Sequence, residues 1–411
     1  MAKLAIHGGP KVKTTPFGTG RRFGGEEIKE LVESLEQNTL FYHHGNKVKT
    51  FLRDFNRLYG AKYSVAASSG TAAMHVALGA AGISVGDEVI TSPITDLGTV
   101  IGILYQNAIP VFADVDPHTY NLNPASVEER ITERTKAIVV VHLAGNPADM
   151  DPLLALAEKY SLKVIEDCAQ SFLADHQGRL VGTLGDYGVF STNDFKQIST
   201  GEGGIVLVNS GDEQDYQRTV MFADKNYNRF AEDRCGSVAY LAPNYRMTEL
   251  QGAVGIAQLK KLPQICAARN RYGEQITEGI RDLPGIYPPL VREGNKSSYW
   301  FYMFRVDEAE LGCSRDAFSR ALAAEGIPNS PGYIPAVLYA YPMFQARTAY
   351  LGTHFPFDLA DVDYAPGSCP TAEEVLATAI RIEISEFYTP EDIQDIITAI
   401  RKVAELAGEI G

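Results

Sequence analysis

The feature that most constrains the fold is a regular alternation of short apolar runs with helical patterns between residues 63 and 208. Runs such as DEVITSP, IPVFADV and KAIVVVHLAG are separated by segments with helical spacing, such as GTAAMHVALGAAG and DMDPLLALAEKYS. Because these runs are continuously apolar rather than alternating, they are typical of parallel strands that helices cover on both faces. The sequence therefore predicts a doubly wound α/β domain, with sites at the carboxyl ends of its strands.

The character of the sequence changes after about residue 264. SYWFYMFRV is aromatic-rich and strand-like, whereas SRDAFSRALAAEGI is typical of a helix. The closing segment TPEDIQDIITAIRKVAELAGEIG predicts a helix with Thr389 as its N-cap and Pro390 in its first turn. We therefore predict a large domain over residues 1–263 and a smaller C-terminal α+β domain over residues 264–411.

Charge and composition exclude several classes of function. The net charge of −14 argues against a general binder of nucleic acid or of anionic membranes, because both need a basic surface. No apolar run is long enough to span a bilayer and the start lacks the core of a signal peptide, so we expect a cytoplasmic protein. The cysteines lack CxxC or CxxH spacing, so no metal site and no disulfide framework are expected. They are Cys168, Cys235, Cys266, Cys313 and Cys369.

A candidate phosphate site lies in SSGTAAM, Ser68 to Met74, where a predicted strand gives way to a helix. The N–H groups of Gly70 and Thr71 would lie at the helix N-terminus, where free donors and the helix dipole stabilise an anion. By itself this pattern is weak. A simple N-cap by Ser69 or Thr71 is the more frequent explanation of such a pattern.

Two further segments place polar or charged residues at the ends of predicted strands. In VIEDCAQSF, Asp167 ends an apolar strand and Gln170 follows; the carboxylate could bind a metal, cap a helix or pair with a protonated ring nitrogen. No His or Cys cluster accompanies it, which disfavours the metal. Ser191 ends the next strand, and Lys196 follows in a polar loop, where a solvated surface lysine is the ordinary interpretation.

Taken together, these segments supply a phosphate cup, an acid at a strand end and a nearby lysine. Pyridoxal 5'-phosphate requires all three. Its phosphate needs N–H donors, its pyridine nitrogen needs a carboxylate, and its aldehyde needs an amine for a Schiff base. The sequence therefore predicts this cofactor, alternating with its aminated form, pyridoxamine 5'-phosphate.

These segments resemble the DegT/DnrJ/StrS family of sugar aminotransferases, which has the fold-type I architecture. The matching blocks run in order from about Gly24 to Leu406, and as a set they are specific. They include SSGTAA, VGDEVI, PVFADVD, KAIVVVHLAG, VIEDCAQS, GDYGVFS, KQISTGEGG and PNYRMTELQGAVG. The closing CPTAEEVL and EFYTPEDI favour the branch that aminates keto-cyclitols and related rings.

The resemblance implies roles for matching positions. Lys196 matches the Schiff-base lysine, and Asp167 the partner of the pyridine nitrogen. Gln170 matches the residue near the cofactor's phenolic oxygen. Asn244 matches an asparagine that reaches the phosphate of the neighbouring subunit, which implies a homodimer with shared active sites. The expected phosphate ligands are Ser69, Gly70, Thr71 and Ser191.

One position departs from the family pattern. The family usually places an aromatic residue over the cofactor ring soon after the DEVI strand, and this chain has Asp96 there. Asp96 cannot stack on a ring, so the neighbouring Thr95 or Leu97 is expected to cover it. The STNDF segment before the lysine also lacks the histidine and proline common in the family.

The expected activity is transfer of an amino group from L-glutamate or L-glutamine to a keto-sugar or keto-cyclitol. Dehydratases of the family replace the lysine with histidine, so Lys196 favours transamination. Glu202, Tyr333 and Tyr339 are candidate contacts of the acceptor, although surface charge and packing explain them equally well. Two alternatives stay open: a dehydratase or lyase that uses the same cofactor, and a regulatory dimer that binds it without turnover.

Overall fold

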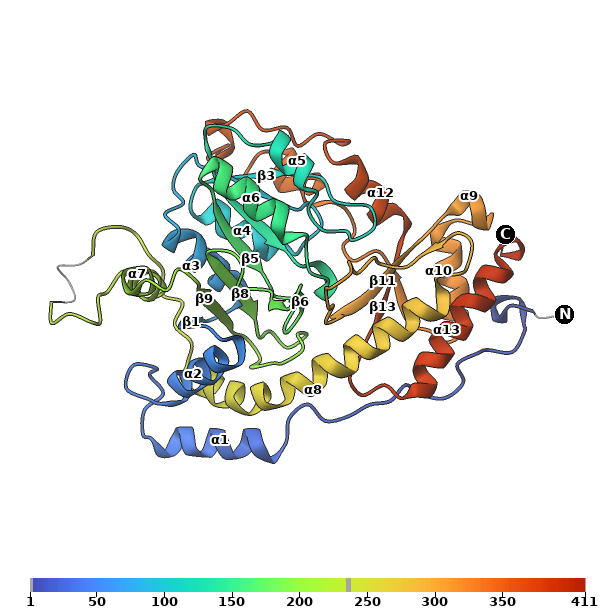
Figure 1. The fold of residues 1–411 in the computed structure, drawn as a ribbon, viewed down its shortest axis with the longest axis horizontal. Helices are drawn as coiled ribbons and strands as arrows, with labels where there is room; N and C mark the ends of the chain where they lie inside the picture. Colours follow the sequence, from blue (N-terminus) through green and yellow to red (C-terminus); the bar gives the residue numbers. More distant parts are fainter. Residues whose placement is uncertain (1–2, 234–237, 411) are drawn as a thin grey trace.

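A computed structural model describes residues 3–233 and 238–410 of the chain, and its larger domain is built on a seven-stranded sheet (Figure 1). The strand order is β1-β9-β8-β5-β4-β2-β3. Strand β9 is antiparallel to both of its neighbours, and the other neighbouring pairs are parallel. The strands are β1 (Tyr63–Ala67), β2 (Glu88–Thr91), β3 (Ile109–Phe112), β4 (Thr135–Val141), β5 (Lys163–Asp167), β8 (Tyr187–Ser191) and β9 (Gly204–Val208). The predicted, mostly parallel sheet is confirmed.

Helices cover both faces of this sheet, which explains why its strands are apolar at every position. In β4, Val139 and Val141 enter a core shared with α3 and α4, whereas Ile138 and Val140 enter a second core with α5 and α6. Towards β9, α2 and α8 cover the second face. The helices of this domain are α1 (Gly25–Glu36), α2 (Lys47–Tyr59), α3 (Gly70–Ala80), α4 (Leu97–Tyr105), α5 (Pro124–Glu129), α6 (Met150–Tyr160) and α7 (Glu213–Ala223). A short ribbon pairs β6 (Asp175–His176) with β7 (Arg179–Leu180).

The C-terminal region forms a smaller α+β unit around a four-stranded antiparallel sheet in the order β10-β11-β13-β12. Its strands are β10 (Ile286–Tyr287), β11 (Phe301–Val306), β12 (Asn329–Pro331) and β13 (Ala379–Glu383), and its helices are α9 (Glu308–Leu311), α10 (Arg315–Ala324), α11 (Pro342–Gln345), α12 (Pro370–Thr378) and α13 (Pro390–Glu405). The predicted closing helix has the expected start, because Thr389 Oγ1 accepts a hydrogen bond from the Asp392 N–H at 3.2 Å.

The two units are joined by more than one segment. Helix α8 (Glu249–Ile280) is continuous, contains Pro263 and runs from the large sheet to the small one (Figure 1). The N-terminal segment also reaches the small unit: Leu4 is buried in its core, and Lys13 pairs with Asp392 at 2.6 Å. A boundary at residue 263 therefore stays a prediction.

Two observations concern the membrane spans and the disulfide framework that the sequence argues against. No helix among the described residues is long and apolar enough to cross a membrane. The cysteines within the described ranges, Cys168, Cys266, Cys313 and Cys369, are buried and unpaired, and Cys235 lies outside those ranges.

Candidate active site

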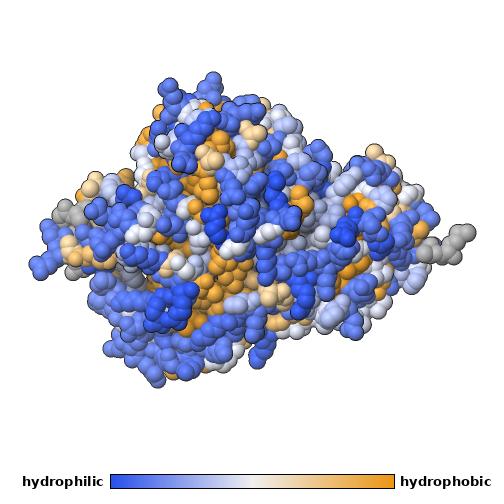
Figure 2. Space-filling view, in the orientation of Figure 1, coloured by the Kyte–Doolittle hydropathy of each residue, from blue (hydrophilic) through white to orange (hydrophobic). Residues whose placement is uncertain are grey.

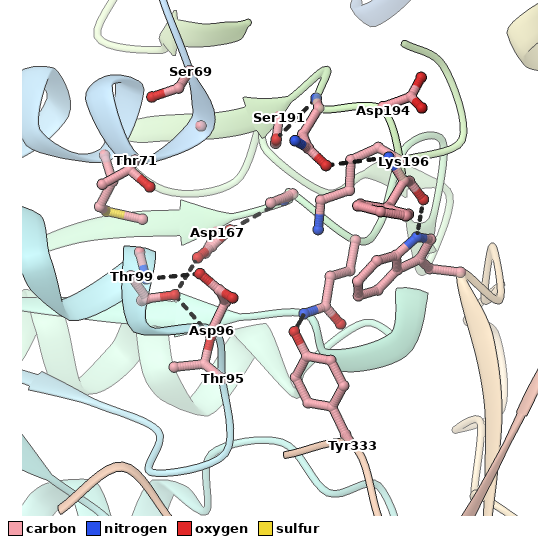
Figure 3. A pocket seen from close by; sticks show the side chains of 18 of the residues that line it. Ser69, Thr71, Thr95, Asp96, Thr99, Asp167, Ser191, Asp194, Lys196 and Tyr333 are labelled. Carbon is pink, nitrogen blue, oxygen red and sulfur yellow. Dashed lines mark hydrogen bonds between the residues drawn. The ribbon is translucent and has the colours of Figure 1, made fainter. Parts of the chain in front are cut away.

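A cavity of about 790 Å³ opens at the carboxyl ends of the large sheet's strands, where the doubly wound fold predicts a site. The end of β5 contributes Asp167 and the end of β8 contributes Ser191. The turn after β1 contributes the start of α3, and the small unit closes the far side with Trp300, which precedes β11, and with residues of β13. Figure 3 shows Asp167, Thr99 and Asp96 on one side of this cavity, with Lys196 reaching toward them from the other.

The N-terminus of α3 is both capped and open to the cavity. Ser69 Oγ accepts the Ala72 N–H at 3.0 Å, so the capping interpretation of Ser69 is confirmed. The first N–H groups of a helix have no intrahelical partners, which leaves those of Gly70 and Thr71 for an anion. A Cβ atom at Gly70 would lie 2.7 Å from Ser191 Cβ. Only glycine therefore allows this close approach between α3 and the end of β8.

Asp167 is buried and held by two hydrogen bonds. Its Oδ2 accepts from Thr99 Oγ1 at 2.7 Å, and its Oδ1 accepts from the Ala169 N–H at 3.1 Å. Thr99 Oγ1 in turn lies 2.7 Å from Thr95 Oγ1. Burial raises the pKa of Asp167, while the two hydrogen bonds and the positive charge of Lys196 lower it. This balance makes the carboxylate a strong partner for a cation in the cavity.

Lys196 lies in the loop between β8 and β9, and its ammonium is packed on an aromatic ring. Its Nζ is 3.7 Å from the centroid of the Trp300 ring, and the indole N–H donates to the Phe195 carbonyl at 2.7 Å. Burial lowers the pKa of Lys196 to about 8, against the opposing effects of Asp167 and Asp96. Arg22 also donates to the carbonyls of Asp194 and Lys196, which holds the loop against the N-terminal segment.

Gln170 is fixed in one orientation by its neighbours. Its Oε1 accepts the Ala144 N–H at 2.7 Å, and its Nε2 donates to the Tyr333 hydroxyl at 3.1 Å. The side chains of Gln170 and Tyr333 both line the cavity. Gln170 therefore connects the large sheet to the small unit at the site.

Asp96 is the N-cap of α4, and its Oδ1 accepts the Gly98 N–H at 2.8 Å. Its side chain lines the cavity where an aromatic residue was expected. Thr95 also lines the cavity, whereas Leu97 does not contribute to its wall and packs against the core.

Of the remaining residues that the sequence proposed for the site, one lines the cavity and two lie outside it. Glu202 lines the cavity and accepts from Asn193 Nδ2 at 2.9 Å. Tyr339 is buried away from it and donates to Glu373 at 2.6 Å. Asn244 is exposed outside the cavity of its own chain, beside Asp224. The sequence did not identify Thr99, Trp300 or Arg381, which also line the cavity, because nothing in their local patterns marks them.

The residue before Asp167 points to the opposite face of β5 and has a structural role. Glu166 is fully buried and lies 3.1 Å from His142 Nε2, and His142 Nδ1 accepts the Ala148 N–H. The Glu166 carboxylate also accepts hydrogen bonds from three backbone N–H groups, those of Gly182, Leu184 and Gly185. Cys168 lies close by, but the ligand atoms of His142 and Glu166 are already engaged in these hydrogen bonds.

The profile of one protein family, the DegT/DnrJ/EryC1/StrS aminotransferase family, matches residues 22–401. The chain belongs to this family. It is 32% identical over 388 residues to the spore coat polysaccharide biosynthesis protein SpsC of Bacillus subtilis, covering 93% of this chain and 95% of that protein. It is 35% identical over 436 residues to the L-glutamine:2-deoxy-scyllo-inosose aminotransferase of Streptoalloteichus tenebrarius, covering 99% of each.

The fold comparison agrees with this assignment. The X-ray structure of the aminotransferase from Psychrobacter cryohalolentis has a TM-score of 0.83 and 30% identity, covering 94% of this chain and 98% of that chain. The DegT/DnrJ/EryC1/StrS enzyme described here is therefore an aminotransferase with the fold-type I architecture. The resemblance inferred from the sequence is confirmed.

Proposed function

We propose that this aminotransferase uses pyridoxal 5'-phosphate to move an amino group from L-glutamine or L-glutamate to a keto-sugar or keto-cyclitol. One observation carries the proposal: Lys196, Asp167 and the N-terminus of α3 face one cavity from three sides. The name of the Streptoalloteichus relative, an L-glutamine:2-deoxy-scyllo-inosose aminotransferase, supports the cyclitol class of acceptor. We propose a place in amino-sugar or aminocyclitol biosynthesis on the same ground.

The phosphate end of the cofactor fits the start of α3. The N–H groups of Gly70 and Thr71 and the hydroxyl of Ser191 would bind the phosphate, and the helix dipole would favour its negative charge. The missing Cβ at Gly70 supports this use, because it keeps the backbone close to Ser191. Ser69 would act mainly by capping the helix and thereby orienting these donors.

The ring end of the cofactor fits Asp167. When bound, the cofactor supplies an electron sink that stabilises negative charge at the α-carbon of the amino acid. Asp167 would keep the pyridine nitrogen protonated, which this electron sink requires. The buried hydrogen bond from Thr99 orients the carboxylate for that task. Gln170 would lie near the phenolic oxygen, with its amide held by Ala144 and Tyr333.

Lys196 would hold the cofactor covalently at rest and move a proton during the reaction. Its lowered pKa of about 8 leaves a useful fraction of the amine neutral near pH 7.5, and only the neutral amine is a nucleophile or a base. After the donor has entered the site, the Lys196 amine would act as the base that takes the proton from the donor's α-carbon and as the acid that gives it back.

Polar groups at the far side of the cavity would bind the acceptor through hydrogen bonds. Because Gln170 Nε2 can only donate, the Tyr333 oxygen accepts that hydrogen bond, which leaves its O–H to donate to a sugar or cyclitol oxygen. Glu202 and Asp96 offer carboxylate acceptors for ring hydroxyls. Neutral polyols are bound by this kind of mixed donor and acceptor set.

We also propose a homodimer with shared sites. Helix α1 exposes an apolar stripe at helical spacing, in which Ile28 is 63% exposed, Val32 48% and Leu35 61%. Apolar residues also reach the surface over the middle of the large domain (Figure 2). Asn244 is exposed and therefore available to a second subunit, as the family resemblance implies.

Absorbance spectroscopy of the purified holoenzyme tests the proposal. The protein should carry the visible band of the bound cofactor, and L-glutamine or L-glutamate should bleach it as the aminated form accumulates. Adding a panel of keto-sugars and keto-cyclitols should then restore the band only with true acceptors. Lys196→Ala should lose the covalent attachment while keeping the far-UV circular dichroism of the fold.

Two outcomes would contradict the proposal. A visible band that no amino donor changes would favour a regulatory protein that binds the cofactor without turnover. Conversion of a sugar substrate with loss of water, and without formation of a 2-oxo acid from the donor, would favour the dehydratase or lyase.

A further inference from the structure

The ammonium of Lys196 lies against the face of the Trp300 ring. Its Nζ is 3.7 Å from the ring centroid, well inside the roughly 6 Å over which an aromatic face attracts a cation, and tryptophan has the strongest such face. Within the described residues, Lys196 Nζ has neither a hydrogen-bond partner nor a carboxylate at ion-pair distance. The ring is therefore the group that holds this ammonium in place.

This contact differs from the other contacts between a lysine and an aromatic ring in the described part of the chain. In each of those, the ring is at most four positions from the lysine in the sequence, and the distances are 4.4–5.0 Å. They belong to Lys13, Lys62, Lys159 and Lys225. Lys196 and Trp300 instead come from the large and the small unit, so their closer contact depends on how the two units pack.

Trp300 is itself fixed by three hydrogen bonds. Its indole N–H donates to the Phe195 carbonyl at 2.7 Å, and its backbone N–H donates to the Ala144 carbonyl at 2.8 Å. Its own carbonyl accepts from Arg269 at 3.0 Å. Because Phe195 directly precedes Lys196, the first bond keeps the ring beside the lysine loop. The ring therefore stays where it is when the lysine side chain moves.

An aromatic face suits an amine that has to change its charge. It attracts the ammonium form but not the neutral amine, and it offers no acceptor oxygen that would compete for the N–H groups. Burial lowers the pKa of Lys196 to about 8, while the charges of Asp167 and Asp96 oppose this effect without contacting Nζ. The ammonium and the neutral amine are therefore both accessible near neutral pH, and only the ammonium is held by the ring.

We propose that Trp300 is a positioning residue that holds the Lys196 amine while it is charged and releases it when it is neutral. The role rests on the proposed function, in which Lys196 accepts a proton from the α-carbon of the amino donor and gives it back. When the amine takes up that proton it becomes the ammonium that the ring attracts. The charged base is thus kept beside the cavity until it returns the proton.

Fluorescence of the cofactor-free protein tests the contact directly, because Trp300 is the only tryptophan of the chain. Its emission should change in one transition centred near pH 8, as the ammonium over the ring loses its charge. Lys196→Met should abolish this transition. Lys159→Met removes a lysine that lies over another ring, that of Tyr160, and should leave the transition unchanged.

Lys196→Met also identifies the group that titrates. The other charged or titratable side chains that face Lys196 or Trp300 remain in this variant, so a transition caused by any of them would persist. They are Asp96, Asp167, Asp194, Arg269, Tyr333 and Arg381.

A second measurement separates the ring face from the indole N–H. Because the chain has one tryptophan, incorporation of fluorinated tryptophans changes position 300 alone. Fluorine withdraws electrons from the ring and weakens its attraction for a cation, while the N–H donor stays. From mono- to trifluorotryptophan, uptake of pyridoxal 5'-phosphate at pH 6.5 should become roughly 3- to 10-fold faster, because more of the amine is neutral, and should stay unchanged at pH 9.5.

Two substitutions complete this series. Trp300→Phe keeps an aromatic face but loses the N–H donor, whereas Trp300→Leu loses both. At pH 6.5 the uptake rate of Trp300→Phe should therefore lie closer to that of the wild type. Circular dichroism should be the same in all variants.

Two results would overturn the proposal. The first is an emission that does not titrate in the wild type, or that titrates equally in Lys196→Met. The second is uptake that does not depend on fluorine, combined with slower uptake at both pH values in Trp300→Phe. The indole would then act only by tethering the lysine loop.

The holoenzyme tests the use of this contact in proton transfer. The rate at which L-glutamine bleaches the visible band should fall as the number of fluorine atoms rises, because the charged base is less stabilised. An unchanged rate would overturn the role in proton transfer. A protein that passes the two cofactor-free tests but responds to no amino donor would refute the proposed function, and that role with it, but not the hold of the ring on the charged amine.

Discussion

The hydrogen bond from Thr99 to Asp167 provides a quantitative test of how the site keeps its carboxylate ionised. Thr99 is 3% exposed, and its Oγ1 donates to Asp167 Oδ2 at 2.7 Å. Thr99→Val preserves the shape of the side chain and removes the donor. A hydrogen bond to a charged group contributes about 2 kcal/mol, so its loss should raise the pKa of Asp167 further.

The pH dependence of stability gives this change a distinctive sign. Burial already raises the pKa of Asp167 above its ordinary value in the folded protein. Between the two values the folded state binds more protons than the unfolded state, so stability falls as the pH rises through this window. Thr99→Val extends the window upward. The variant should therefore lose about 2 kcal/mol at pH 8 and clearly less at pH 5.

Urea denaturation of the cofactor-free protein at the two pH values measures the effect. Thr219→Val is the matched control, because Thr219 is fully buried on α7 and donates to the Asp215 carbonyl at 2.8 Å. That bond joins two neutral groups, so its loss should cost about 1 kcal/mol at both pH values. If the two variants lost stability equally at pH 5 and pH 8, Thr99 would not be stabilising the ionised form of Asp167.

Three further predictions concern the same cavity. Gly70→Ala should weaken pyridoxal 5'-phosphate binding by about 10-fold or more in equilibrium dialysis, because its Cβ would clash with Ser191, whereas Gly24→Ala, with open space around its Cβ, should not. The rate at which the cofactor-free enzyme takes up the cofactor should rise with pH through about 8, because only the neutral Lys196 amine attacks; a profile flat between pH 6 and 9 would contradict this. Asp96→Asn keeps a good N-cap for α4 but removes a charge that raises the pKa of Lys196, so stopped-flow measurements should show this profile displaced to lower pH.

The local sequence was sufficient where chemistry follows from a strand end. Asp167 and Ser191 close apolar runs, and the carboxyl ends of parallel strands must meet at one edge, so their convergence could be predicted before the strand order was known. The cap at Ser69 and the glycine at position 70 follow from the same strand-to-helix joint. Asp96 was recognised as a departure from the family pattern, although its role as the N-cap of α4 became clear only in the structure.

The residues that complete the site could not be predicted in this way. Thr99 reaches Asp167 across 68 positions, Trp300 reaches the lysine loop across 105, and Arg381 comes from a separate sheet. Nothing in their local sequences marks any of the three as a residue of the site.

The sequence by itself thus determined the strand-end groups and the parallel sheet that gathers them, because both depend on short-range patterns. The tertiary structure decided the rest, because strand order and the packing of the small unit against the large one determine which distant side chains share the cavity. These contacts set the environment of Lys196 and Asp167, which determines the direction in which the pKa of each is shifted.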